Sequence, residues 1–72
     1  NFRAPQESSA FLKERLRRAL GTLDPRDAEM FTLRYVEGLS NGEIAQLYGV
    51  LKARVAMRLY KIRLSLQAEM ER

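Results

Sequence analysis

The chain contains no cysteine and no histidine among its 72 residues. These absences exclude disulfides, thiol-ligated metal sites and catalysis by Ser–His or Cys–His pairs. The chain also has no glycine-rich phosphate loop, no signal-peptide pattern and no apolar run near the roughly 20 residues that span a bilayer. We therefore expect no enzymatic activity, no metal, no cofactor and no membrane partner. The lack of cysteine is compatible with a reducing cytoplasm, where we expect the protein to act.

What is present is a basic and moderately hydrophobic composition. There are 13 Lys and Arg against 9 Asp and Glu, which gives a net charge of +4 and a pI near 10.0. Such an excess suits an anionic partner such as a nucleic acid, although a soluble domain without that partner can carry it too. The hydrophobic content of 46% is ample for one compact domain. Because the chain opens on Asn1 and not on Met, we expect it to be a piece of a longer protein.

The pattern of apolar residues predicts an all-α fold, a small four-helix domain over residues 10–72. Residues 1–9 have no periodicity and carry Pro, Gln and Ser, so they are predicted to form a linker. The first helix is expected to start with Ser8 or Ser9 as its N-cap and to end at Gly21. Its apolar stripe comprises Phe11 or Leu12, then Leu16, Ala19, Leu20 and Leu23.

The second and third helices carry stronger start signals. Asp24 is a suitable N-cap with Pro25 at the first helical position, and this helix is expected to reach about Val36. Ser40 and Glu43 have the spacing of a capping box, in which each side chain accepts a backbone N–H bond at the start of the third helix. The residues expected to face inward are Ala28, Phe31 and Tyr35 in the second helix and Ile44, Ala45 and Leu47 in the third.

A fourth helix is expected from about Lys52 to Met70, after a turn at Gly49. Its core stripe is Val55, Leu59, Ile62 and Leu66, at helical spacings. A short capped helix, a glycine turn and a longer basic helix are typical of a helix-turn-helix, whose second helix commonly reads the DNA major groove.

The segment LDPRDAEMFTLRYVEGLSNGEIAQLYGV, residues 23–50, resembles region 4, the C-terminal domain of extracytoplasmic-function (ECF) sigma factors of bacterial RNA polymerase. The points of similarity are the LRY of 33–35, the EGLS of 37–40, the EIA of 43–45 and the V-x-x-R-L of 55–59. The resemblance implies a monomeric domain that reads the −35 element of promoter DNA and docks on the beta-flap of RNA polymerase. It also implies a sister domain, region 2, upstream, and an anti-sigma factor as a further partner.

Helical geometry divides the fourth helix into faces. Arg54, Arg58 and Lys61 lie on one flank and Lys52 and Arg63 on the other, so both flanks suit contacts with phosphate groups. The face opposite the core holds Ala53, Met57, Tyr60 and Leu64. Arg54 and Lys61, at the edge of that face, are the best candidates to reach guanine.

The full set of predicted DNA contacts includes the start of the third helix, where free backbone N–H groups favour a phosphate. Arg26, in the first turn of the second helix, is a further candidate for contact with the DNA backbone. The predicted DNA-binding residues are Ser40, Asn41, Lys52, Ala53, Arg54, Met57, Arg58, Tyr60 and Lys61.

Leu51, Ala56 and Met57 depart from the family pattern, which tends to be polar at these positions. Leu51 cannot cap the fourth helix, and the loss of a side-chain N-cap typically costs ~1 kcal/mol. Apolar residues on the outer face are also typical of a partner-binding surface. Two alternatives therefore stay open: a sigma-like protein-interaction domain that binds an anti-sigma factor, and a LuxR-like helix-turn-helix regulator domain.

The apolar residues of the first two helices have two interpretations. Leu16, Leu20, Phe31 and Tyr35 are expected to be core residues on their spacing. The resemblance implies a second role, because the polymerase flap helix packs on an apolar surface made by these two helices. Sequence alone leaves both interpretations open.

Overall fold

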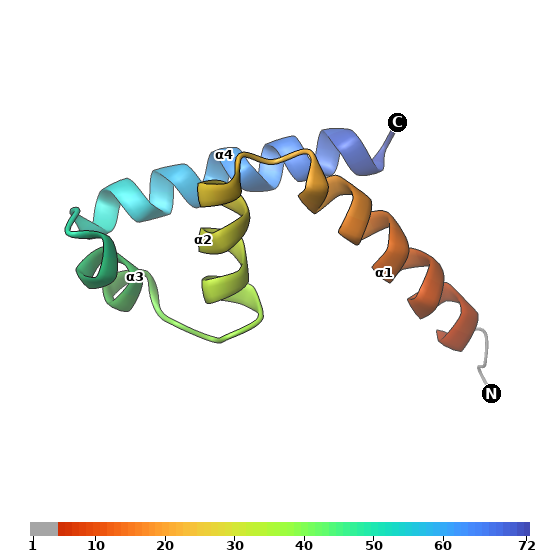
Figure 1. Cartoon of the computed structure of the whole chain (residues 1–72), viewed down its shortest axis with the longest axis horizontal. Helices are drawn as coiled ribbons and strands as arrows, with labels where there is room; N and C mark the ends of the chain where they lie inside the picture. Colours follow the sequence, from red (N-terminus) through yellow and green to blue (C-terminus); the bar gives the residue numbers. More distant parts are fainter. Residues whose placement is uncertain (1–4) are drawn as a thin grey trace.

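The computed structural model describes the backbone of residues 5–72 and the side chains from Ser9 onward. Within this range the chain forms four helices and no strand: α1 (Pro5–Gly21), α2 (Pro25–Tyr35), α3 (Asn41–Tyr48) and α4 (Lys52–Met70). The predicted all-α fold class is confirmed. α4 runs along the length of the molecule, and each of the other three helices packs on it (Figure 1).

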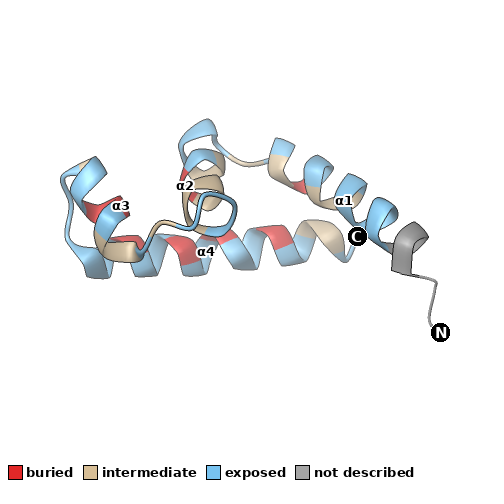
Figure 2. Cartoon of the chain, turned by 90° about the horizontal axis from the view of Figure 1, so that it is seen from below, coloured by how far each residue is buried: buried red, intermediate tan, exposed pale blue. Residues whose placement is uncertain are grey.

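The core is built on one side of α4. Val55, Leu59, Ile62 and Leu66 are all buried there, as the helical spacing predicted. Figure 2 shows this buried stripe on the side of α4 that faces α2 and α3, while most of the remainder of the helix is exposed. The other buried hydrophobic residues are Ala19 from α1, Met30 from α2, and Ile44 and Ala45 from α3. Since every helix gives at least one residue to the cluster, the four-helix arrangement depends on α4 as its common support.

The local signals at the start of α2 and at both ends of α3 are confirmed. The Asp24 side chain accepts a hydrogen bond from the backbone N–H of Arg26 at 2.8 Å. At α3, Ser40 Oγ accepts from the Glu43 N–H at 3.0 Å, and Glu43 Oε1 accepts from the Ser40 N–H at 2.8 Å. Gly49 ends α3 in the left-handed region with φ 69°, which glycine adopts without the steric cost that a Cβ would bring. These bonds fix where α2 and α3 start and how α3 turns into α4.

The expected start of the first helix at Ser8 or Ser9 is wrong. α1 begins at Pro5, because proline is well suited to the first helical turn, where its missing N–H leaves no hydrogen bond unmade. Residues 5–9 of the predicted linker are therefore helical, and residues 1–4 lie outside the described part of the chain.

The N-terminal half of α1 extends away from the other helices (Figure 1), which gives the molecule dimensions of 44 × 26 × 16 Å. Phe11 and Leu12, one of which was expected to start the buried stripe, are both exposed. Only the last turns of α1 reach the core, through Ala19 and the partly buried Leu20. The apolar stripe of α1 is thus longer than the surface available to cover it.

Two further burial predictions are wrong. Leu47 is 62% exposed, because Tyr48, one helical turn after Ile44, takes the position in α3 that packs against the core. Tyr35 is 46% exposed at the C-terminal end of α2, where its ring lies 4.8 Å from that of Phe31, centroid to centroid. In place of these two residues the core includes Met30, which the sequence analysis did not select.

Candidate nucleic-acid interface

The exposed face of α4 is supported by the turn that joins it to α3. Gly49 and the backbone N–H of Val50, which donates to Ala45 O at 3.0 Å, reverse the chain so that α4 starts beside the end of α3. Ile44 and Val55 are both fully buried, and so they hold the two helices together below the turn. The first turns of α4 are consequently presented to solvent above a buried contact with α3.

The structure brings most of the predicted DNA-binding residues to this exposed surface. The α4 residues of the set are all exposed: Lys52, Ala53, Arg54, Met57, Arg58, Tyr60 and Lys61. Met57, Tyr60 and Leu64 are about half exposed and lie opposite the core stripe, as the helical geometry predicted. This helix can therefore present cationic and apolar side chains to a groove of DNA without any rearrangement of the core.

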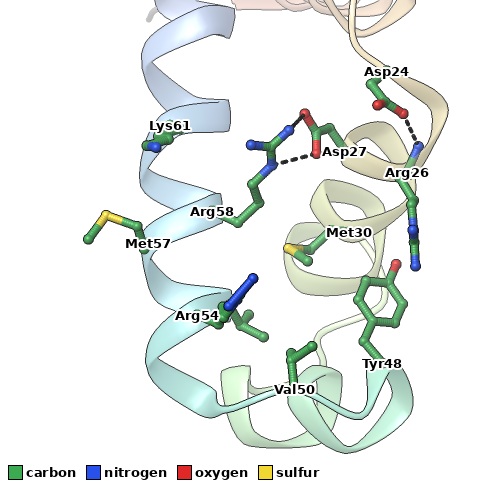
Figure 3. A pocket seen from close by; sticks show the side chains of 11 residues that line it. Asp24, Arg26, Asp27, Met30, Tyr48, Val50, Arg54, Met57, Arg58 and Lys61 are labelled. Atoms are coloured by element: carbon green, nitrogen blue, oxygen red, sulfur yellow. Dashed lines mark hydrogen bonds and ion pairs between the residues drawn. The ribbon is translucent and has the colours of Figure 1, made fainter.

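A groove of about 540 Å³ lies between α4, the start of α2 and the α3–α4 turn (Figure 3). Four cationic side chains line it: Arg26 from α2, and Arg54, Arg58 and Lys61 from α4. The carboxylates of Asp24 and Asp27 and the apolar residues Met30, Tyr48, Val50, Val55 and Met57 complete its lining. The predicted flank of Arg54, Arg58 and Lys61 is thus one wall of a real groove, and α2 supplies the opposite wall.

The three cations of this flank differ in their electrostatic surroundings. Arg58 makes a bidentate ion pair with Asp27, in which Nε donates to Oδ1 and Nη2 donates to Oδ2, both at 2.8 Å. The carboxylate raises the pKa of Arg58 above its ordinary value, because it accepts two hydrogen bonds from the charged guanidinium and attracts it. In the part of the chain that the structure describes, Arg54 and Lys61 have no carboxylate partner. Their full charge is available to an anion.

The opposite wall is organised around Tyr48, which sequence reasoning did not select. Its hydroxyl donates to Glu29 Oε1 at 2.7 Å, and the guanidinium carbon of Arg26 lies 5.8 Å from the centre of its ring. Burial, together with the hydrogen bond to Glu29, raises the pKa of Tyr48 to about 12. The neutral tyrosine joins α3 to α2 and supports Arg26 at the rim of the groove by a cation–π contact. Only the long-range pairing of α2 with α3 reveals this role.

The start of α3 is occupied by its own cap. Ser40 and Glu43 satisfy each other's backbone N–H groups, which confirms the capping interpretation of Ser40. Asn41 is half-buried, and its Oδ1 is buried with no hydrogen-bond partner among the described residues. Because the carbonyl oxygen of Asn41 faces the interior, only the remainder of its side chain is offered to a phosphate.

The second predicted flank of α4 is used partly within the protein. Arg63 Nη1 donates to the hydroxyl of Tyr35 at 2.7 Å, which ties α4 to the C-terminal end of α2. Lys52 is exposed at the start of α4.

The residues predicted to contact the polymerase flap differ in burial. Leu20 and Phe31 pack against the core, Leu16 is half-buried and Tyr35 is exposed.

The described part of the chain holds no cluster of three or more His, Cys, Asp or Glu side chains suited to a metal ion. None of the helices in residues 5–72 has the length and apolar character needed to cross a membrane.

Comparison with known proteins agrees with this geometry. Residues 13–66 match the family described as "Sigma-70, region 4". The chain is also 39% identical over 59 residues to the Positive control factor of Bacillus subtilis (strain 168). That alignment covers 82% of this chain and 35% of the relative, so the chain spans about a third of the relative's length. No solved structure matches significantly. The family is one of DNA-binding domains that regulate transcription, not a family of enzymes, and the chain belongs to it as a sigma-70 region 4 domain.

Proposed function

We propose that this domain reads the −35 element of promoter DNA with α4 and docks on the beta-flap of RNA polymerase through α1 and α2. In this proposal residues 10–72 act as the region 4 domain of an ECF-type sigma factor, which works as a monomer in the cytoplasm. The observation that carries the proposal is the pair Arg54 and Lys61, two cations without a carboxylate partner in the described structure, on the exposed face of α4.

The charge distribution supports a contact with duplex DNA. Arg54 and Lys61 are two helical turns apart on one side of α4, about 10 Å along the helix axis. The apolar side chains of Ala53, Met57 and Tyr60 are exposed beside them. Ala53 and Met57 suit the methyl groups of thymine, and the cations suit phosphates or the O6 and N7 atoms of guanine. The expected binding is weak in isolation and strongly salt dependent, because phosphate contacts release counterions.

The direct test is a selection of bound duplexes from a random pool at low salt, followed by sequencing. We expect the 72-residue chain to enrich a short motif. Replacement of Lys61 or Arg54 by Ala should relax one position of that motif, at a cost of about 1–3 kcal/mol for the preferred base. Lys13→Ala, a change of the same charge on exposed α1, is the matched control and should leave the motif intact. Salt-sensitive binding without any enriched motif would contradict the proposal.

The second candidate is a sigma-like interaction domain whose partner is an anti-sigma factor. Leu51, 75% exposed, and Met57, 57% exposed, favour it because large apolar side chains on a surface are typical of protein contacts. The change Met57→Ser separates the two candidates. Tighter binding to the selected duplex would favour the DNA reader, whereas unchanged DNA binding with lost capture of the anti-sigma factor would favour the interaction domain. The family match favours both over a LuxR-like regulator domain.

A further inference from the structure

The contact between Asp27 and Arg58 joins a carboxylate on α2 to the helix proposed to read DNA. The two residues are 31 positions apart in the chain, yet both carboxylate oxygens are paired with the same guanidinium at 2.8 Å (Figure 3). The Asp27 side chain is only 16% exposed, whereas that of Arg58 is 49% exposed. Asp27 is thus the fixed member of the pair, and Arg58 is the member that a ligand can reach.

The geometry of the pair leaves one edge of Arg58 open. A guanidinium has five N–H donors in a planar fork, and the Asp27 carboxylate occupies the edge formed by Nε and Nη2. The edge formed by Nη1 and the second hydrogen of Nη2 has no acceptor among the described residues. That edge has the geometry for two parallel hydrogen bonds to a guanine, and the carboxylate fixes the plane in which it lies.

We propose that Asp27 is a positioning residue for DNA recognition, which holds Arg58 in a base-reading orientation and keeps it from binding phosphates indiscriminately. This inference rests on the proposed function. A free arginine on α4 would be attracted to any phosphate within reach and would add sequence-independent affinity. An arginine whose guanidinium is already paired on one edge cannot turn freely toward nearby phosphates. Its open edge can still make directional hydrogen bonds to the edge of a base.

The same pair has an electrostatic consequence. Asp27 places a negative charge in the groove wall opposite Arg54 and Lys61 and thereby lowers the attraction of this surface for DNA in general. The domain therefore has a lower affinity for random duplexes than its cations alone would give. In exchange it gains discrimination at the base pair that Arg58 contacts.

The test measures both quantities on the variant Asp27→Asn, which has nearly the same shape but lacks the charge and one of the two acceptors. Binding is measured for the duplex selected by the wild-type chain and for random duplexes, over a range of salt. For Asp27→Asn we expect tighter binding to random duplexes, and a log–log salt slope steeper by about 0.9, the equivalent of one added phosphate contact. Discrimination at one position of the motif should fall by about fivefold or more.

Two controls separate positioning from charge or folding. Glu37→Gln removes a carboxylate from the exposed α2–α3 loop and should not relax any position of the motif. In an Arg58→Ala background, Asp27→Asn should have no effect on discrimination, because the residue through which it acts is gone. Thermal unfolding of each variant confirms that the domain is folded.

The outcomes distinguish this inference from the proposed function. If the wild-type chain enriches no motif, the proposed function is overturned, and this inference with it. If the wild-type chain enriches a motif that Asp27→Asn reads with equal discrimination, only the role of Asp27 is overturned. The same holds if Asp27→Asn weakens binding to selected and random duplexes alike, since a purely structural ion pair would have that effect.

Discussion

Leu51 stands at the N-cap of α4 without being able to act as a cap, and this predicts a stabilising substitution. Its backbone has φ −75° and ψ 148°, the extended conformation of an N-cap residue, but its side chain makes no capping hydrogen bond. The change Leu51→Ser would place a hydroxyl oxygen where it can accept from the N–H of Ala53, since the N–H of Arg54 already donates to Leu51 O at 2.9 Å. No backbone movement is needed for this bond.

The expected magnitude follows from two opposing terms. A side-chain cap contributes ~1 kcal/mol. Leu51 is 75% exposed, so the change removes only about a quarter of the 1.5–3 kcal/mol that full burial of leucine would contribute, or about 0.5 kcal/mol. The net gain in the free energy of unfolding is about 0.5 kcal/mol, which for a domain of this size raises the Tm by about 2–4 °C.

The assay is thermal unfolding followed by circular dichroism, on Leu51→Ser and on Leu51→Ala as its control. Leu51→Ala loses the same apolar contact without providing a cap, so it should be less stable than Leu51→Ser by ~1 kcal/mol. Ser40→Ala, which removes the cap that α3 already has, should lower stability by a similar amount. Equal unfolding temperatures for the serine and alanine variants at Leu51 would refute the capping argument.

The remaining predictions concern the core and the groove wall. Leu59→Ala should lower the free energy of unfolding by about 2–5 kcal/mol, because Leu59 is buried in the α4 stripe against which the other helices pack. Chemical denaturation would measure this free energy. A decrease below about 1 kcal/mol would contradict the central role of α4. Ionisation of Tyr48 should break its hydrogen bond to Glu29. Since the pKa of Tyr48 is raised from 10.0 to about 12, the stability it adds is complete below pH 10 and lost as pH rises through about 12. The difference between the ultraviolet titrations of the wild type and Tyr48→Phe isolates this group, and a midpoint near pH 10 would contradict its burial and pairing.

Much of the fold could be predicted because its signals are local. The caps at Asp24 and Ser40 and the turn at Gly49 depend on hydrogen bonds and backbone conformations within a few residues, which the sequence specifies directly. The stripe from Val55 to Leu66 was predicted correctly because a helix of this length repeats its apolar spacing several times. The exposed flanks of α4 follow from the same geometry.

The predictions that proved wrong concern the extent of contact between elements. The spacing of α1 made Phe11 or Leu12 look buried, but no helix lies beside that end of α1 in the described structure. Leu47 and Tyr35 were assigned to the interior on spacing alone, although each helix has room for only part of its apolar face against α4. Periodicity shows which side of a helix is apolar, while the length of its neighbour decides how much of that side is covered.

The sequence by itself determined the four-helix class, the helix-turn-helix and the identity of the basic residues on α4, because each depends on residues close together in the chain. Only the tertiary structure decided how those residues are used. The pairing of Arg58 with Asp27, of Tyr48 with Glu29 and of Arg63 with Tyr35 joins residues that lie between 19 and 31 positions apart. Helix spacing cannot supply these partners, since they arise where α2 packs across α3 and α4. That crossing leaves Arg54 and Lys61 unpaired in the described structure and fixes Arg58 between them.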